Sequence, residues 1–81
     1  MMARVTLLYF ASLRDGAGRA QETIDTPAPD LRALYAEARG RHGFALPVER
    51  LRVAVDGAFA GWGDPVRDGS EVAFIPPVSG G

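Results

Sequence analysis

The sequence has no cysteine and no lysine among its 81 residues. Without cysteine, the chain cannot form disulfides or thiolate metal sites, and it cannot use a cysteine nucleophile. Without lysine, it has no side-chain amine for Schiff bases or for isopeptide bonds to itself. It also lacks any apolar run near the roughly 18 residues of a membrane-spanning helix, and its N-terminus lacks the pattern of a secretory signal. These absences predict a cytoplasmic protein with no membrane partner.

An excess of charge of one sign is also lacking. Nine basic residues, all of them arginine, stand against ten acidic residues, and the net charge is −1. Because proteins that bind nucleic acids present a basic stripe to the phosphate backbone, we expect no nucleic-acid partner. The only histidine, His42, cannot anchor a zinc site without cysteines or a second imidazole, so no metal is expected. We interpret His42 as an exposed residue near a helix C-terminus.

The composition that remains is that of one globular domain. The chain is 47% hydrophobic and 23% charged, which excludes intrinsic disorder, and its length leaves no room for a second domain. Short apolar runs between turn residues predict strands, and apolar residues at helical spacing predict a helix. The predicted strands span residues 4–10, 21–25, 51–55, 58–60 and 71–75, and the predicted helix spans about 29–41.

The connections between these elements predict the fold. Residues 15–18 are interpreted as a hairpin turn between the first two strands, and Asp56 with Gly57 predicts a type I′ turn with positive φ. Asp30 is expected to cap the helix. A right-handed crossover through the helix places the first and last strands side by side in parallel. This order predicts an α+β protein of the β-grasp type, a mixed sheet of about five strands with one main helix packed on one face. The helix would cover the sheet with Leu31, Leu34, Tyr35 and Ala38.

No catalytic constellation is visible within the domain. Residues 15–18 do not predict a dinucleotide loop, because Gln21 stands where a third glycine would fall and no helix is expected to follow. Asp64 and Asp68 are interpreted as residues of a solvated turn. The hydroxyl side chains have no base paired with them in the sequence. They belong to Ser12, Ser70 and Ser79.

The end of the sequence differs from the rest. Residues 76–81 read Pro-Pro-Val-Ser-Gly-Gly. Six residues can extend about 20 Å, two prolines favour an extended chain, and two glycines leave the tip without side chains. We therefore divide the chain into a domain over residues 1–75 and a flexible tail over residues 76–81. A tail of this shape can thread a narrow channel and place its terminal carboxylate in the active site of another protein.

Two segments resemble the MoaD-like sulfur carriers, the small subunits of molybdopterin synthase within the ubiquitin-related β-grasp superfamily. They are LYFASLR at residues 8–14 and DGSEVAFIPPVSGG at residues 68–81. A third, VAVDG at residues 53–57, is similar to the family's third strand and turn, with Asp56 where asparagine is usual. The resemblance implies that Gly81 carries the sulfur and that Gly80 keeps the tail slim.

The resemblance also implies which partners the chain uses. A carboxylate is an anion at neutral pH and a poor electrophile, and in the family an ATP-dependent adenylating enzyme converts it to an acyl-adenylate. A sulfur donor protein then supplies the sulfur of a thiocarboxylate. The large synthase subunit uses that sulfur on the pterin precursor, in what is expected to be a heterotetramer. The chain itself is expected to bind no cofactor, and the catalytic side chains would belong to the partner.

Apolar residues beside the tail are the candidates for partner contact. One of Phe74 and Ile75 must face each side of its strand. For Phe59 the alternative is packing in the core, and for Trp62 it is loose packing on the surface. The full set of candidates is Phe74, Ile75, Pro76, Pro77, Val78, Ser79, Phe59 and Trp62.

Three other functions stay open on the sequence alone. The chain could carry sulfur for another pathway, such as synthesis of the thiamin thiazole, with the same tail and the same activation. It could be a ubiquitin-like modifier of other proteins, although the absence of lysine forbids chains built on itself. It could also be an interaction module whose tail takes part in no chemistry.

Overall fold

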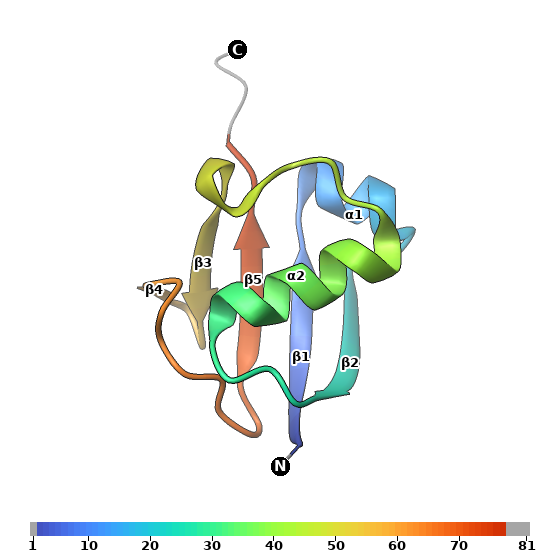
Figure 1. Cartoon of the computed structure of the whole chain (residues 1–81). Helices are drawn as coiled ribbons and strands as arrows, with labels where there is room; N and C mark the ends of the chain where they lie inside the picture. The colour runs from blue at the N-terminus through green and yellow to red at the C-terminus, as the bar shows by residue number, and fades with distance from the viewer. Residues whose placement is uncertain (1, 78–81) are drawn as a thin grey trace.

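The computed structural model describes residues 2–77, which form one mixed sheet, two α-helices and one short 3-10 turn (Figure 1). Neither described helix is long and apolar enough to cross a membrane. In chain order the elements are β1 (Ala3–Tyr9), α1 (Ala11–Ala17), β2 (Gln21–Thr26), α2 (Leu31–His42), the 3-10 turn η1 (Val48–Arg50), β3 (Arg52–Val55), β4 (Ala58–Ala60) and β5 (Glu71–Ile75).

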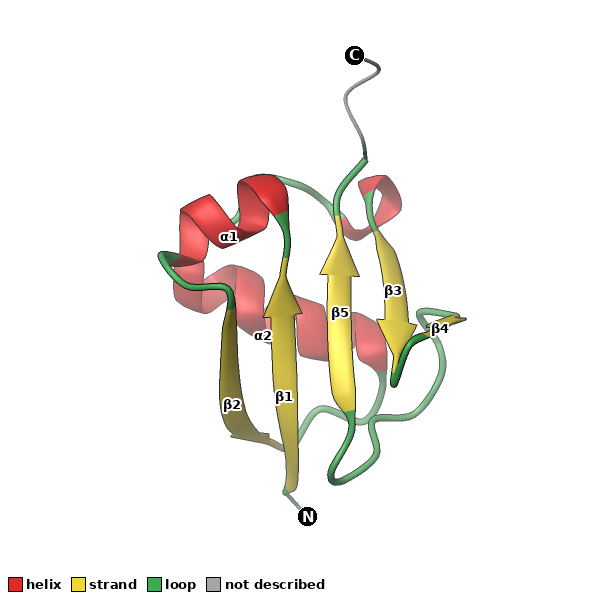
Figure 2. Cartoon of the chain, turned by 180° about the vertical axis from the view of Figure 1, so that it is seen from behind, coloured by secondary structure: helices red, strands yellow, loops and turns green. Residues whose placement is uncertain are grey.

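The strands lie in the order β2-β1-β5-β3-β4. β1 and β5 pair in parallel at the centre, with Leu7 opposite Val72 and Tyr9 opposite Phe74. The pairs β1–β2, β3–β5 and β3–β4 are antiparallel. Figure 2 shows β1 and β5 side by side with α2 crossing behind them. This topology confirms the predicted α+β fold of the β-grasp type.

Helix α2 packs on one face of the sheet through the stripe that the sequence predicts. The side chain of Asp30 caps the helix by accepting a 2.8 Å hydrogen bond from the backbone N–H of Ala33, and Gly43 ends it in the left-handed conformation with φ 71°. Because side chains alternate along a strand, every second strand residue faces α2 and the others face away from it. The buried apolar residues of the stripe and of the strand face that it covers are Leu31, Leu34, Tyr35, Ala38, Val5, Leu7, Tyr9, Ile24, Val53, Val72 and Phe74.

The connection between β1 and β2 differs from the one that the sequence predicts. The two strands pair as an antiparallel hairpin, but helix α1 stands between them where a tight turn over residues 15–18 was predicted. Leu13 is buried in the core and Ala17 packs against it, which anchors the helix. Gly18, with φ 74°, ends the helix and donates its N–H to the Arg14 carbonyl at 2.9 Å. Seven residues are too few for a helical periodicity to be visible in the sequence.

The turn between β3 and β4 is confirmed. Asp56 has φ 51° and Gly57 has φ 87°, the left-handed values that a type I′ turn requires at both central residues. The Asp56 carboxylate also accepts a hydrogen bond of 2.9 Å from the backbone N–H of Glu71. The turn is thereby tied to β5, the strand that leads into the tail.

Candidate functional site

The tail begins at the end of the sheet where the two central strands finish. β1 and β5 run in parallel, so both strands end on the same side of the molecule (Figure 2). β1 ends there at Tyr9 and β5 at Ile75. Pro76, which follows β5, is buried, and Pro77 is exposed. The other tail residues for which a function is predicted, Val78, Ser79, Gly80 and Gly81, lie outside the described residues.

The sheet face turned away from α2 is polar at one end and apolar at the other. Far from the tail, Arg4 and Asp25 form an ion pair of 3.0 Å, and the hydroxyls of Thr6 and Thr23 lie 3.1 Å apart. Nearer the tail, one cross-strand row contains the apolar residues Leu8, Ala73, Ala54 and Phe59, which are paired in register. Gln21 of β2 ends this row opposite Leu8.

We call the apolar end of this face the open-face patch. It consists of Leu8, Phe10, Ala54, Phe59, Ala73 and Ile75, and these residues line a hollow of about 300 Å³ together with Gly57 and Glu71. Phe10 is 45% exposed and Phe59 is 70% exposed. Side chains of this size are rarely left in water in a group without a partner. The open-face patch therefore has the character of a docking surface, and it adjoins the root of the tail.

Phe74 and Ile75 lie on opposite faces of β5, and the structure shows which face each of them occupies. Phe74 is 0% exposed, and its ring centroid lies 5.1 Å from that of Tyr35 and 6.1 Å from that of Trp62. Ile75 is half-buried and lines the hollow on the open face. The predicted partner contact therefore does not hold for Phe74, which is a core residue. Ile75 is the outward side chain of the pair.

The two aromatic candidates outside β5 differ in their surroundings. Phe59 is not a core residue, because β4 presents it on the open face, where the guanidinium of Arg52 lies 5.7 Å from its ring centroid. Trp62 is half-buried and stacks on the core residue Phe74 with an interplanar angle of 11°. Trp62 thus closes one end of the core, and it is not part of the open-face patch.

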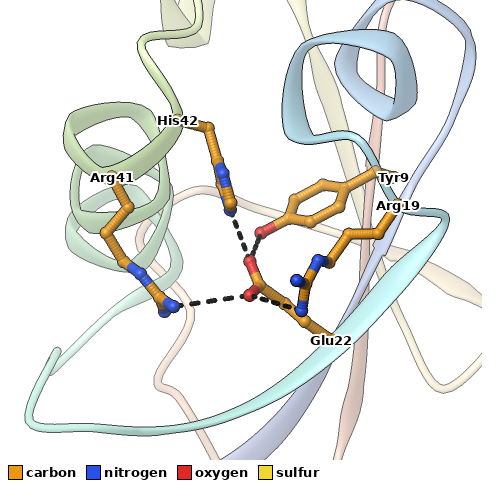
Figure 3. A network of polar contacts seen from close by, with 5 residues as sticks. All are labelled: Tyr9, Arg19, Glu22, Arg41 and His42. Carbon is orange, nitrogen blue, oxygen red and sulfur yellow. Dashed lines mark hydrogen bonds and ion pairs between the residues drawn. The ribbon is translucent and has the colours of Figure 1, made fainter.

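A second polar feature lies between β1, β2 and the end of α2 (Figure 3). The side chain of Glu22 is only 5% exposed, and it forms ion pairs with Arg41 at 3.4 Å and Arg19 at 3.8 Å. It also accepts hydrogen bonds from the Tyr9 hydroxyl at 2.5 Å and from Nε2 of His42 at 2.6 Å. His42 is therefore not an exposed residue, and its side chain is 15% exposed. Its carboxylate partner stands 20 positions away in the sequence, so local patterns did not reveal it.

The electrostatics of this cluster keep Glu22 ionised. Burial raises the pKa of Glu22, but the hydrogen bonds from Tyr9 and His42 and the charge of Arg41 outweigh burial, so the pKa lies below its usual value. Burial and the bond to Glu22 raise the pKa of Tyr9 far above the usual range. Among residues 2–77, no three His, Cys, Asp or Glu side chains are grouped so as to hold a metal ion. The cluster joins three elements and acts as a clamp on the fold.

A model described as the ThiS family matches residues 7–81. The chain belongs to the ThiS family. The molybdopterin synthase sulfur carrier subunit of Escherichia coli (strain K12) is 34% identical over 95% of this chain and 99% of its own length. The human subunit of the same name is 35% identical over 99% of this chain and 97% of its own length.

A solved structure agrees with these relatives. A putative molybdopterin converting factor, subunit 1, from Pyrococcus furiosus matches with a TM-score of 0.77 and 29% identity, over 94% of this chain and 99% of that one. The resemblance to the MoaD-like sulfur carriers that the sequence indicates is therefore confirmed, and so is the ubiquitin-like β-grasp fold.

In this ThiS-family chain, sequence reasoning missed four residues of the open-face patch, which are Leu8, Phe10, Ala54 and Ala73. The partner contacts were predicted only beside the tail and near the short fourth strand. The signal was present in the alternation of β1, where Val5, Leu7 and Tyr9 are buried and the residues between them face away. Only the parallel pairing of β1 with β5 places Leu8 beside Ala73.

We expect Glu22→Gln to lower the free energy of unfolding at neutral pH by roughly 1.5–3 kcal/mol, because it removes the charged acceptor of the buried cluster. The folded-state pKa of Glu22 is lowered, so its contribution is complete above the unfolded-state pKa and is lost as the pH falls through the folded-state pKa. Denaturant unfolding of both proteins across a series of pH values should therefore show a difference that disappears in acid. Asp25→Asn is the control, since its ion pair with Arg4 is exposed. The role of the cluster as a clamp is contradicted if the difference in the free energy of unfolding does not depend on pH. It is also contradicted if Asp25→Asn loses as much stability as Glu22→Gln.

Proposed function

We propose that this chain is the sulfur carrier subunit of a molybdopterin synthase and that it carries sulfur as a thiocarboxylate on Gly81. The observation that supports this most is the position of the open-face patch directly beside the root of the tail. One partner can cover the patch and receive the tail at the same time. The two curated relatives, which match nearly the whole chain, bear the name of this subunit.

The proposed chemistry takes place on the carboxyl group of Gly81. Its oxygen attacks the α-phosphorus of ATP in an adenylating enzyme, and pyrophosphate leaves. The outer sulfur of a donor protein's persulfide then attacks the acyl carbon and AMP leaves, which forms an acyl disulfide. A thiol reduces this disulfide, so the thiocarboxylate is released and the donor's inner sulfur ends in a disulfide with that thiol. The large subunit transfers the thiocarboxylate sulfur to the pterin precursor. Glycine at positions 80 and 81 allows a channel too narrow for a side chain.

The domain supplies the docking surface for this reaction. Ile75 is proposed as the central contact, with Phe59, Phe10 and Leu8 around it, because large apolar residues at the centre of an interface contribute most to binding. Pro76 and Pro77 restrict the direction in which the tail leaves β5. A heterotetramer with the large subunit, the use of ATP only by the activating enzyme and a cytoplasmic location are further parts of this proposal.

A sulfur carrier of another pathway is the main alternative. Such a carrier would use the same fold, tail and activation, and it would differ only in the protein that receives the sulfur. The names of both curated relatives favour molybdopterin synthase as the recipient. A protein modifier would instead form an amide bond between Gly81 and a lysine of another protein.

The test is to incubate the chain with ATP, its adenylating enzyme, a persulfide-bearing sulfur donor and a thiol reductant, and to measure its intact mass. We expect a mass increase equal to the exchange of one oxygen for sulfur, with loss of that sulfur when the large subunit and the pterin precursor are added. No mass increase overturns the carrier function. Loss of sulfur only to a thiazole-forming synthase supports the alternative carrier, and covalent adducts with other proteins support the modifier.

A further inference from the structure

A second groove runs along the other side of the tail root. It has a volume of about 410 Å³, and its lining includes Arg50, Arg52, Phe59, Ile75 and Pro76. We call it the root groove. Phe59 and Ile75 line both this groove and the hollow of the open-face patch. A protein that covers the patch therefore also reaches the root groove.

Arg50 and Arg52 give the root groove an excess of positive charge over its one carboxylate, that of Glu49. Within residues 2–77, the arginines that form ion pairs are Arg4, Arg19, Arg32 and Arg41. Arg50 and Arg52 form none with any described carboxylate. Glu49 also lines the groove, but its carboxylate pairs with Arg32 of α2 at 3.9 Å. The guanidinium of Arg52 lies over the Phe59 ring instead, so charge and apolar surface stand next to each other.

This charge acts only over a short range. The net charge of the chain is −1, so the molecule as a whole does not attract an acidic protein, and charges in physiological salt are screened beyond about 8 Å. A partner that covered Arg50 and Arg52 with apolar surface would remove water from two charges without replacing it, which opposes binding. A partner that offers carboxylates there gains complementarity and a fixed orientation.

We propose that the large synthase subunit places an acidic segment in the root groove, with carboxylates on Arg50 and Arg52 and an apolar side chain against Phe59. This inference rests on the proposed function and specifies the chemistry of the partner surface. The contact sits beside the point where the tail leaves β5, so it orients the tail toward the active site of the partner. It also makes the association dependent on salt.

The experiment measures the association of the full chain with its purified large subunit over a range of salt concentrations. At low salt we expect Arg52→Glu and Arg50→Glu each to weaken binding about tenfold or more, because charge complementarity becomes repulsion. The wild-type affinity should fall as salt rises, and the affinity of these variants should not. Arg67→Glu is the matched control. It makes the same change of charge at an exposed arginine outside both grooves, and it should bind like wild type.

Each outcome separates this inference from the function on which it rests. Binding by the groove variants that equals wild type, with unchanged melting temperatures, overturns the acidic segment and leaves the carrier function intact. The same variants are also tested for binding to the adenylating enzyme. If Arg50→Glu and Arg52→Glu weaken binding to that enzyme but not to the large subunit, the choice of the large subunit as the partner is overturned. If the wild-type chain neither binds the large subunit nor accepts sulfur, the proposed function itself fails. If Arg67→Glu weakens binding to the large subunit as much as the groove variants do, the effect comes from the net charge of the chain. That result also overturns the proposed contact in the root groove.

Discussion

Deleting Gly81, or adding one residue after it, is expected to abolish sulfur transfer while the domain folds as before. An extra residue turns the carboxyl group of Gly81 into an amide, which cannot be adenylated. A deletion moves the new terminal carboxyl about 3.3 Å back along the tail, away from the reacting atoms of the partner. The domain should not change, because the last described strand ends at Ile75. Intact mass after activation and a thermal melt test the two halves of this prediction.

Deleting Met2 is the matched control for the length of the chain. Met2 is 60% exposed and precedes β1, so its loss shortens the chain by one residue at the opposite terminus. Sulfur loading and melting temperature should both stay at wild-type values. Transfer at the wild-type rate by an extended variant whose mass proves it unprocessed would show that Gly81 is not the sulfur-bearing residue.

Most of the fold could be predicted because its determinants are local. The stripe of α2 is a periodic pattern, and the Asp56-Gly57 turn follows from two residue types that accept positive φ. The handedness of the crossover then brings β1 beside β5. Helix α1 could not be predicted, because it is held by Leu13 reaching a core that is assembled from distant strands.

The site could be predicted only in part for the same reason. The alternation of side chains along β5 predicts that one of Phe74 and Ile75 faces outward. Which of the two does so depends on which face of the strand α2 covers. The position of Leu8 beside Ala73 depends on the pairing of β1 with β5, and the contact of His42 with Glu22 joins residues 20 positions apart. Such contacts leave no periodic signal in a single sequence.

Ile75→Asp and Phe74→Asp are expected to fail in opposite ways, although the two residues are adjacent. Ile75 lies on the open face, so Ile75→Asp should leave the free domain folded. It should weaken association with the large subunit by about 2 kcal/mol or more. Phe74 is 0% exposed, so its aspartate buries an unpaired charge, and a small domain is only marginally stable. Calorimetry of binding, with a thermal melt of each variant, distinguishes the two results.

Thr23→Asp is the control for the charge that both variants introduce. Thr23 is exposed on β2, in the polar part of the same sheet face and outside the open-face patch, so this variant should fold and bind like wild type. If Ile75→Asp folds and binds like wild type, the partner does not dock on the patch. If Thr23→Asp and Ile75→Asp weaken binding equally, the effect comes from negative charge on this face. A selective loss in Ile75→Asp, with Phe74→Asp unfolded, means that a single strand divides the core of the domain from its docking surface.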